Sequence, residues 1–259
     1  MTLNADTRGA EPPPVYEGKA KRVKRRADGL VELEYKDDAT AFNGQRRDRF
    51  AGKGRLNSEI SELLFAYLAA HGVPSHARGR LDEKTLLAEQ AQIVPLEVVV
   101  RFQVAGSLRK RTGLADGTLC DPPIVEFYYK RDDLGDPLLN PEHIRMLQLA
   151  TPAELQELES LARRAAGLLR ELCARAGLQL FDLKFEFGRT AHGLVLADEI
   201  SPDTCRFRDA RSGESLDKDV FREGSGELLR GYRIVHERLR AASSGPSTQG
   251  EDSLPGTRR

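Results

Sequence analysis

Alternating hydrophobic and polar positions predict strands in the first half of the chain. Residues 15–26 and 30–37 are predicted to form a β-hairpin that turns at Ala27-Asp28-Gly29. A polar, glycine-rich loop is expected at 38–54. Short buried strands are expected at 98–100, after a break at Val94-Pro95-Leu96, and at 124–130.

Three helices are predicted from apolar residues at helical spacing. The first carries the stripe from Leu56 to Leu68 and stops at Gly72-Val73-Pro74. The clearest covers 152–176, with Thr151 as N-cap and Glu154 completing a capping box. A last helix is expected at about 226–240. Helices grouped between antiparallel strands indicate the α+β class.

A second strand pair, 178–188 and 194–200, carries the densest candidate chemistry. Period two places Phe181, Leu183, Phe185 and Phe187 on one face, and Asp182, Lys184 and Glu186 on the other. If Gly188 lies opposite Leu194, Asp198 lies opposite Lys184 and diagonal to Glu186. Such paired acids bind Mg²⁺, although cross-strand ion pairs on a solvated face would give the same pattern.

Candidate ligand-binding groups are expected on two further segments. Asp203 and Arg206 are predicted on the loop that follows Pro202, where a rigid strand positions a ligand-binding loop. Arg101 at a strand end, with Ser107 shortly after it, offers a guanidinium fork and a hydroxyl to a phosphate. An ordinary turn and an exposed arginine remain the alternatives for these segments.

Near the N-terminus, Lys19 and Lys21 fall on one face of a predicted strand beside Gly18, an arrangement suited to covering nucleotide phosphates. The basic run that continues to Arg26 also resembles a small nucleic-acid patch. Neither a Walker loop nor a Rossmann fingerprint is present, and the five histidines lack metal-ligand spacing. Cys205 has no adjacent base that would make it a nucleophile.

Composition narrows the functional classes. The 259 residues carry 40 Lys+Arg and 40 Asp+Glu, so the net charge is zero, which disfavours a general nucleic-acid binder. No apolar run is long enough for a membrane helix, and no secretory signal is visible. Three cysteines without a CxxC motif fit a reducing compartment, so we expect a cytoplasmic protein. Residues 1–14 and 241–259 are predicted to be disordered.

Taken together and in order, several segments resemble the SAICAR synthetase family (phosphoribosylaminoimidazole-succinocarboxamide synthases). The resemblance covers roughly residues 15–239. The resembling segments are Tyr16-Glu17-Gly18-Lys19-Ala20-Lys21, Gly52-Lys53-Gly54, 95–101, Ala105-Gly106-Ser107-Leu108, 126–130, 132–137, 184–188, 198–206 and 216–222.

The resemblance implies a two-lobed α+β fold with ATP between the lobes. Residues 15–95 would form the smaller, mostly antiparallel lobe that covers ATP, and residues 96–240 the larger lobe for substrates and Mg²⁺. The implied reaction joins L-aspartate to the carboxylate of carboxyaminoimidazole ribonucleotide through an acyl phosphate, and releases ADP and phosphate. A homodimer is also implied, with no nucleic-acid or membrane partner.

The resemblance also assigns roles by position. Lys19 and Lys21 would contact ATP phosphates, and Glu186 and Asp198 would bind Mg²⁺. Lys184 and Asp182 would lie near the reacting carboxylate, and the segment at 94–98 would meet adenine. The ribonucleotide would be held by Arg101, Ser107, Arg206, Asp203, Lys218 and Arg222.

The chain departs from the family pattern at a few positions. Phe102 stands where many relatives have Asn, Arg208 where the familiar version has Trp, and Ser75-His76-Ala77 replaces Thr-His-Phe. The first departure is expected to change packing beside the ribonucleotide pocket and the second to alter the loop after Arg206. None of them removes a charged residue with an assigned role. The alternative functions are a small-molecule kinase that uses the same ATP and Mg²⁺ cleft, and a non-catalytic RNA-binding module.

Overall fold

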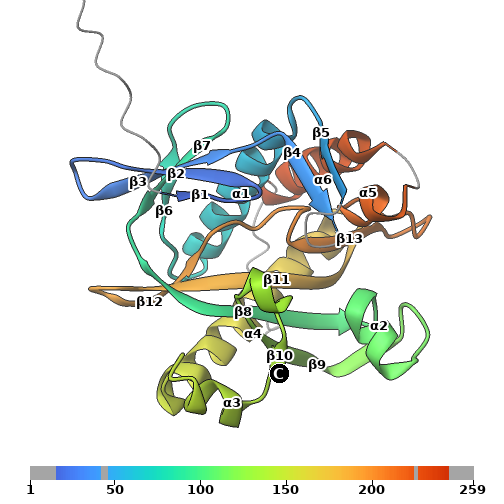
Figure 1. The fold of residues 1–259 in the computed structure, drawn as a ribbon. Helices are drawn as coiled ribbons and strands as arrows, with labels where there is room; N and C mark the ends of the chain where they lie inside the picture. The colour runs from blue at the N-terminus through green and yellow to red at the C-terminus, as the bar shows by residue number, and fades with distance from the viewer. Residues whose placement is uncertain (1–15, 42–45, 225–226, 245–259) are drawn as a thin grey trace, which may run out of the picture.

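The fold is built around two antiparallel sheets, which a computed structural model describes for residues 16–41, 46–224 and 227–244 (Figure 1). The smaller sheet has the order β1-β2-β3-β7-β6 and the larger one the order β10-β9-β8-β11-β12, with β13 also paired to β11. The α+β class is therefore confirmed. None of the helices in the described residues is long and apolar enough to cross a membrane.

The smaller sheet begins with the predicted hairpin. Its strands are β1 (Tyr16–Glu17), β2 (Lys21–Arg25), β3 (Leu30–Tyr35), β6 (Ala77–Arg80) and β7 (Thr85–Glu89). The turn between β2 and β3 is closed by the Leu30 backbone N–H, which donates to Asp28 Oδ1 at 3.1 Å, while Gly29 takes φ +80°. A left-handed residue of this kind favours glycine, which explains why Asp28-Gly29 marks the turn.

The larger sheet contains longer strands than the sequence suggests. They are β8 (Gln92–Gln103), β9 (Leu119–Tyr129), β10 (Leu138–Leu139), β11 (Leu178–Thr190), β12 (Gly193–Ala197) and β13 (Cys205–Asp209). The expected break at Pro95 is wrong, because β8 runs through it. Pro95 lies where the register between β8 and β11 shifts, so its missing N–H removes no ladder bond there.

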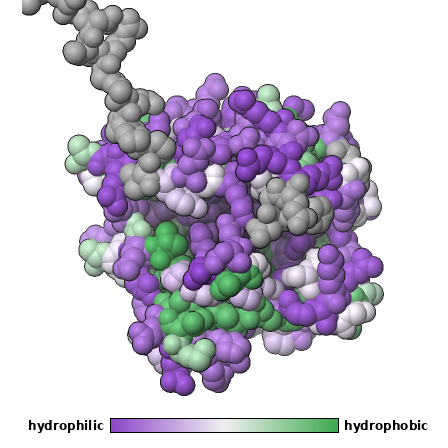
Figure 2. All heavy atoms as spheres, in the orientation of Figure 1, coloured by the Kyte–Doolittle hydropathy of each residue, from purple (hydrophilic) through white to green (hydrophobic). Residues whose placement is uncertain are grey.

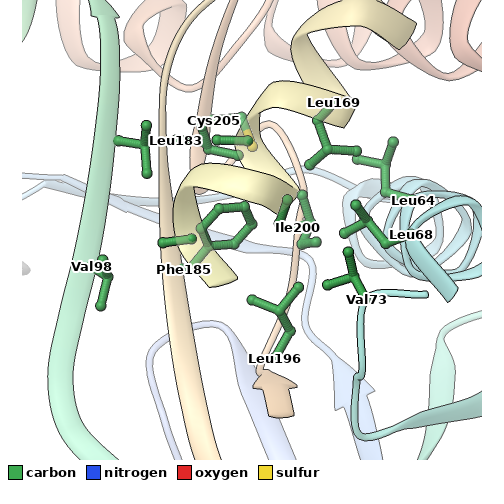
Figure 3. Packing of buried hydrophobic residues seen from close by; sticks show 14 of the residues in the cluster. Leu64, Leu68, Val73, Val98, Leu169, Leu183, Phe185, Leu196, Ile200 and Cys205 are labelled. Carbon is green, nitrogen blue, oxygen red and sulfur yellow. The ribbon is translucent and has the colours of Figure 1, made fainter. Parts of the chain in front are cut away.

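The helices pack against both sheets. They are α1 (Lys53–Ala70), α2 (Gly106–Thr112), α3 (Pro141–Met146), α4 (Pro152–Arg175), α5 (Asp219–Glu223) and α6 (Leu228–Ser243), with a 3₁₀ turn, η1, at Asp132–Leu134. The capping box at the start of α4 is present as predicted, since Thr151 and Glu154 each accept from the other's backbone N–H. Figure 3 shows α1 and α4 packing against β11 through Leu64, Leu169 and Phe185.

Two predictions about local structure are wrong. The segment 38–54 is not one loop: β4 (Asp38–Ala41) pairs with β5 (Arg46–Arg49), and α1 begins at Lys53. Ala39 is fully buried in β4, and this alternation was hidden by the polar residues around it. In addition, Phe181 leaves the apolar face of β11, because it is the extra residue of a bulge opposite β13. Its ring packs instead beneath the Arg208 guanidinium at 4.1 Å.

The hairpin of β11 and β12 has a register one residue away from the expected one. Gly188 pairs with Val195, and the turn is a tight one between Thr190 and Gly193. The ladder ends at Ala197, so Asp198 does not pair with Lys184 but follows the strand with φ +65°.

The predicted termini and lobes are only partly covered by the described residues. Residues 1–14 and 245–259 lie outside them, while α6 continues to Ser243, beyond the predicted start of the tail at Ala241. The predicted boundary at 95/96 falls inside β8, and the two-lobe division stays a prediction.

Candidate active site

A cavity of about 480 Å³ is lined by residues from both sheets. Its walls come from the end of the smaller sheet, from β8, β11 and β13 of the larger one, and from the chain around α5. Predicted site residues that line it are Lys19, Arg101, Asp182, Lys184, Asp203, Arg206, Lys218 and Arg222. The larger-sheet strands are side by side, which explains how residues so far apart in sequence meet.

The other predicted residues stand beside this lining. Ser107, in the first turn of α2, accepts a hydrogen bond from Arg101 Nη2 at 3.0 Å. Glu186 Oε1 lies 3.3 Å from Lys184 Nζ, and Asp198 Oδ1 lies 2.8 Å from Lys21 Nζ. Arg206 is on strand β13 and not on the predicted loop, because pairing with β11 resumes at Cys205.

Two arginines converge on one buried carboxylate in the cavity wall. Asp182 Oδ2 accepts from Arg101 Nη1 at 2.6 Å and from Arg206 Nη1 at 2.8 Å. The three residues are held by adjacent strands, since Asp182 pairs with Arg101 of β8 and with Arg206 of β13. Two guanidinium groups fixed at this spacing form a ready binding site for a phosphate group.

Each of these arginines has a second carboxylate partner that the sequence did not single out. Arg101 Nε donates to Glu126 Oε2 at 2.7 Å, and Arg206 Nε donates to Asp219 Oδ2 at 2.7 Å. Burial opposes the charge of Arg206, but Asp182 and Asp219 outweigh it and raise its pKa. Glu126 and Asp219 both lie within segments that resemble the family. Membership of these segments could have identified them, whereas an acidic residue by itself could not.

A cluster of lysines and carboxylates occupies the neighbouring part of the larger sheet. Lys184 Nζ on β11 lies 2.5 Å from Glu97 Oε1 on β8, and Lys130 pairs with Glu186. Burial disfavours the charge of Lys184, but Glu186 and Glu97 outweigh it and raise its pKa. Lys184 therefore carries a positive charge beside the cavity at neutral pH.

The smaller sheet contributes its two predicted lysines. Lys21 Nζ lies 2.8 Å from Asp198 Oδ1 and 2.6 Å from Glu199 Oε1, while Lys19 Nζ lies 2.7 Å from Asp132 Oδ1. Burial opposes the charge of Lys21, but the carboxylates of Asp198 and Glu199 raise its pKa well above the usual value. These contacts connect the smaller sheet to the larger one.

Glu186 and Asp198 fit a Mg²⁺ ion that also contacts phosphate oxygens. Burial alone would raise the pKa of Asp198, but Lys21, Lys130 and Lys184 outweigh it and lower the pKa, so the carboxylate is ionised. In the part of the chain that the structure describes, no three His, Cys, Asp or Glu side chains form a metal site. One or two carboxylates completed by phosphate and water is the donor set typical of Mg²⁺.

Asp203 is held by a buried network that the sequence analysis missed. Its Oδ1 accepts from Tyr232 Oη at 2.6 Å, and its Oδ2 accepts from Asn57 Nδ2 at 2.9 Å and from Lys53. Lys53 is completely buried. Burial favours the neutral acid, but Lys53 and Lys218 outweigh it and lower the pKa of Asp203. The carboxylate is thus fixed and ionised in the cavity wall.

The departures from the family pattern leave the cavity lining intact. Phe102 packs into the main core under the Arg170 guanidinium at 4.9 Å. Arg208 binds Asp116 at 2.7 Å and covers Phe181, which ties the loop after α2 to β13. His76 is buried against Phe65, and burial lowers its pKa to about 4.

The family model described as SAICAR synthetase matches residues 14–239. The chain belongs to the SAICAR synthetase family. Its relatives include the phosphoribosylaminoimidazole-succinocarboxamide synthase of Thermococcus kodakarensis, which is 51% identical over 226 residues, 87% of this chain and 96% of the relative. The synthase of the same name from Shouchella clausii is 52% identical over 227 residues, 87% of this chain and 95% of the relative.

Solved structures of SAICAR synthetases have the same fold. A SAICAR synthetase in complex with ADP superimposes with a TM-score of 0.85 at 45% identity, covering 87% of this chain and 97% of that one. The phosphoribosylaminoimidazole-succinocarboxamide synthase of Ehrlichia chaffeensis gives 0.86 at 39% identity, covering 88% and 98%. The family resemblance predicted from the sequence is therefore confirmed.

Proposed function

We propose that the chain is an ATP-dependent ligase of purine biosynthesis that joins L-aspartate to the carboxylate of carboxyaminoimidazole ribonucleotide. The observation that carries this proposal is the cavity, where a pair of arginines, a lysine cluster and fixed carboxylates meet in a member of this family. The products are the succinocarboxamide ribonucleotide, ADP and phosphate.

The chemistry explains why such a site is rich in charge. A carboxylate resists nucleophiles because of its own negative charge, and phosphorylation by ATP turns it into an acyl phosphate with a good leaving group. The amine of aspartate then attacks the acyl carbon, an amide forms, and phosphate departs. Phosphoryl transfer depends mainly on positioning and charge neutralisation, so the protein needs no nucleophile of its own.

The proposed roles follow the geometry of the cavity. Arg101, Arg206 and the hydroxyl of Ser107 lie together, which supports binding of the 5′-phosphate there. Asp182, which contacts both arginines, and Lys184, in the lysine cluster, both line the cavity, and the reacting carboxylate would lie near them. Asp203, Lys218 and Arg222 complete the wall that faces the ribonucleotide.

ATP is proposed to bind between the predicted lobes, with its adenine near residues 94–98. Lys19 and Lys21 would contact its phosphates, exchanging carboxylate partners for phosphate oxygens. Mg²⁺ held by Glu186 and Asp198 would neutralise charge on the transferred phosphoryl group. The relative solved in complex with ADP supports use of an adenine nucleotide.

The deciding experiment measures ADP release by the purified chain with Mg²⁺ and ATP while aspartate or the carboxylated ribonucleotide is omitted in turn. We expect release to require both, with a succinocarboxamide product. Release that needs the ribonucleotide but ignores aspartate would instead indicate a kinase, and no release from folded protein would contradict catalysis.

The metal ligands are tested by Glu186→Gln and Asp198→Asn. Each variant should fold normally and lose Mg²⁺-dependent turnover, since one carboxylate of the ligand pair is lost. Near-normal turnover of both variants at low Mg²⁺ would refute the assignment.

We also propose a cytoplasmic homodimer. The free, buried thiols of Cys120, Cys173 and Cys205 suit a reducing compartment. Figure 2 shows hydrophobic side chains gathered on the lower part of one face, and Leu138, Met146 and Leu147 are exposed on β10 and at the end of α3. Sedimentation equilibrium tests this assembly, and a monomer at micromolar concentration would contradict it.

A further inference from the structure

Lys218 differs from every other cation in the cavity wall. Lys19, Arg101, Lys184, Arg206 and Arg222 each pair with a carboxylate. Within the described residues, the ammonium of Lys218 has neither a carboxylate at ion-pair distance nor a hydrogen-bond acceptor. A half-buried cation left without a partner, in a site where all others are paired, points to a task that needs its nitrogen free.

The surroundings of Lys218 explain why it lacks a partner. Its backbone N–H donates to Pro202 O at 3.1 Å, so it lies against the loop that carries Asp203. The Asp203 carboxylate is already bound by Lys53, Asn57 and Tyr232, all of which come from α1 and α6. The acid that acts most strongly on the charge of Lys218 is therefore committed to another lysine.

The charges that face Lys218 come from each element packed around it. Asp203 and Glu199 on the loop after β12 favour its protonated form, whereas Lys53 of α1 and Arg222 of α5 oppose it. Burial is the largest influence, and together with Lys53 and Arg222 it lowers the pKa of Lys218. The amine of Lys218 therefore gives up its proton more readily than an ordinary lysine does.

The proposed reaction needs such a base. At neutral pH, the amino group of aspartate is an ammonium ion whose lone pair is bound to a proton, so it cannot attack a carbonyl. Several of the carboxylates that line the cavity, Asp182, Asp203, Glu97 and Asp132 among them, are already paired with cations, so their oxygens are less available to the ammonium group of aspartate. An unpartnered amine whose pKa is lowered toward the working pH is the better general base.

We propose that Lys218, in its neutral form, accepts the proton from the ammonium group of aspartate, a role that rests on the proposed function. The freed lone pair forms the C–N bond to the acyl carbon, and the C–O bond to phosphate breaks with its electron pair going to the phosphate. The second proton leaves the new amide nitrogen with that phosphate. Lys218 then returns its proton to water.

The test separates the base from a simple anion-binding cation. Lys218→Arg keeps the positive charge but cannot supply a neutral nitrogen at neutral pH. Aspartate-dependent turnover should fall about 10²- to 10⁴-fold. Hydroxylamine, which is uncharged at neutral pH, needs no base, so hydroxylamine-dependent ADP release should fall at least tenfold less than aspartate-dependent turnover, about an order of magnitude being the contribution the base must exceed.

A second variant tests the same step through its pH profile. Lys218→Cys alkylated with 2-bromoethylamine installs an amine that is less basic than lysine. Turnover with aspartate should return, and the acidic limb of the kcat profile should move to lower pH. Alkylated wild type is the control, and Cys173 and Cys205 should resist the reagent because burial raises the pKa of both thiols.

Each result supports or overturns the role of Lys218. Equal losses with aspartate and hydroxylamine, an unshifted pH limb, or undiminished turnover by Lys218→Arg would each overturn it. Lys84→Arg, on the exposed surface, should leave both reactions unchanged. If Lys218→Arg does not fold, the alkylated variant decides. Failure of the proposed function is distinguishable, because ADP release by wild type would then not depend on aspartate.

Discussion

Replacing Asp182 by asparagine tests how the two arginines of the cavity are held. Asp182 is only 3% exposed and accepts from both Arg101 and Arg206, so the substitution removes the shared negative charge while keeping the shape. Removing one partner of a buried ion pair costs about 3–5 kcal/mol. Arg101 retains Glu126 and Arg206 retains Asp219, which reduces the expected loss to about 2–3 kcal/mol of unfolding free energy.

Urea unfolding without ligand measures this loss of unfolding free energy. The substitution should also lower the melting temperature by about 5–10 °C. The variant also leaves uncompensated positive charge facing the cavity. Inorganic phosphate should therefore stabilise Asp182→Asn more than wild type, because an anion that binds only the folded state raises its stability.

A matched control is Glu159→Gln, which removes an exposed pair with Arg163 on α4, both side chains being 42% exposed. It should cost less than about 0.5 kcal/mol. If Asp182→Asn costs no more than this control, or if phosphate stabilises both proteins equally, the arginines are not held by Asp182 in the way the structure indicates.

Three further outcomes are expected. Gly54→Ala places a methyl group in a steric clash with the Tyr35 backbone oxygen and should cost about 1–3 kcal/mol. Gly167→Ala, in open space on α4, should instead stabilise the protein by about 0.5–1 kcal/mol, and thermal melts measure both changes. Burial, followed by repulsion from Asp219, raises the pKa of Asp217 from 3.8 to about 7, so the folded state binds its proton more tightly and this contribution to stability is lost as pH rises from about 4 to 7. Unfolding of wild type and Asp217→Asn across that range should show the difference, and parallel pH profiles would contradict it. Lys21→Met should raise the KM for ATP about 10- to 100-fold in steady-state kinetics while that for the ribonucleotide changes little, and equal rises would place Lys21 elsewhere.

The alternation of side chains along a strand was enough to predict part of the site. Asp182, Lys184 and Glu186 share a face of β11 because the period of two needs only an unbroken strand over that stretch. The bulge at Phe181 lies before this segment, so it changes the position of the phenylalanine alone. The alternation therefore predicted which side chains of β11 share a face. It did not predict how the neighbouring strand is aligned with them.

The register between β11 and β12 depends on their turn, whose length the sequence does not define. The hairpin closes at Thr190 and Gly193, one residue away from the expected pairing, since a tight turn and a longer loop suit the same residues. Asp198 is still near Lys184 and Lys21, because it directly follows the paired Ala197. Glu186 and Asp198 therefore remain candidates for a shared metal site although the assumed register was wrong by one residue.

The network around Asp203 could have been suspected from helical periodicity. Lys53 and Asn57 fall on the same face of α1 as Leu56, Ile60 and Leu64, where a charged side chain must find a buried partner. The position of Tyr232 among the buried residues of α6 carries a similar signal. The partner itself lies 150 residues away from Lys53 in sequence, so only the tertiary structure identifies Asp203.

The cavity combines strong local charges with little net charge, and this balance has consequences for how substrates bind. Its lining has six cations (Lys19, Arg101, Lys184, Arg206, Lys218 and Arg222) against five carboxylates (Glu97, Asp132, Asp136, Asp182 and Asp203). Long-range attraction of phosphates is therefore weak, in keeping with the zero net charge of the chain. Affinity must come from short contacts to groups that neighbouring carboxylates already hold in place, which cost little reorganisation during catalysis. Binding of the ribonucleotide should accordingly depend on salt far less than binding to a basic patch would.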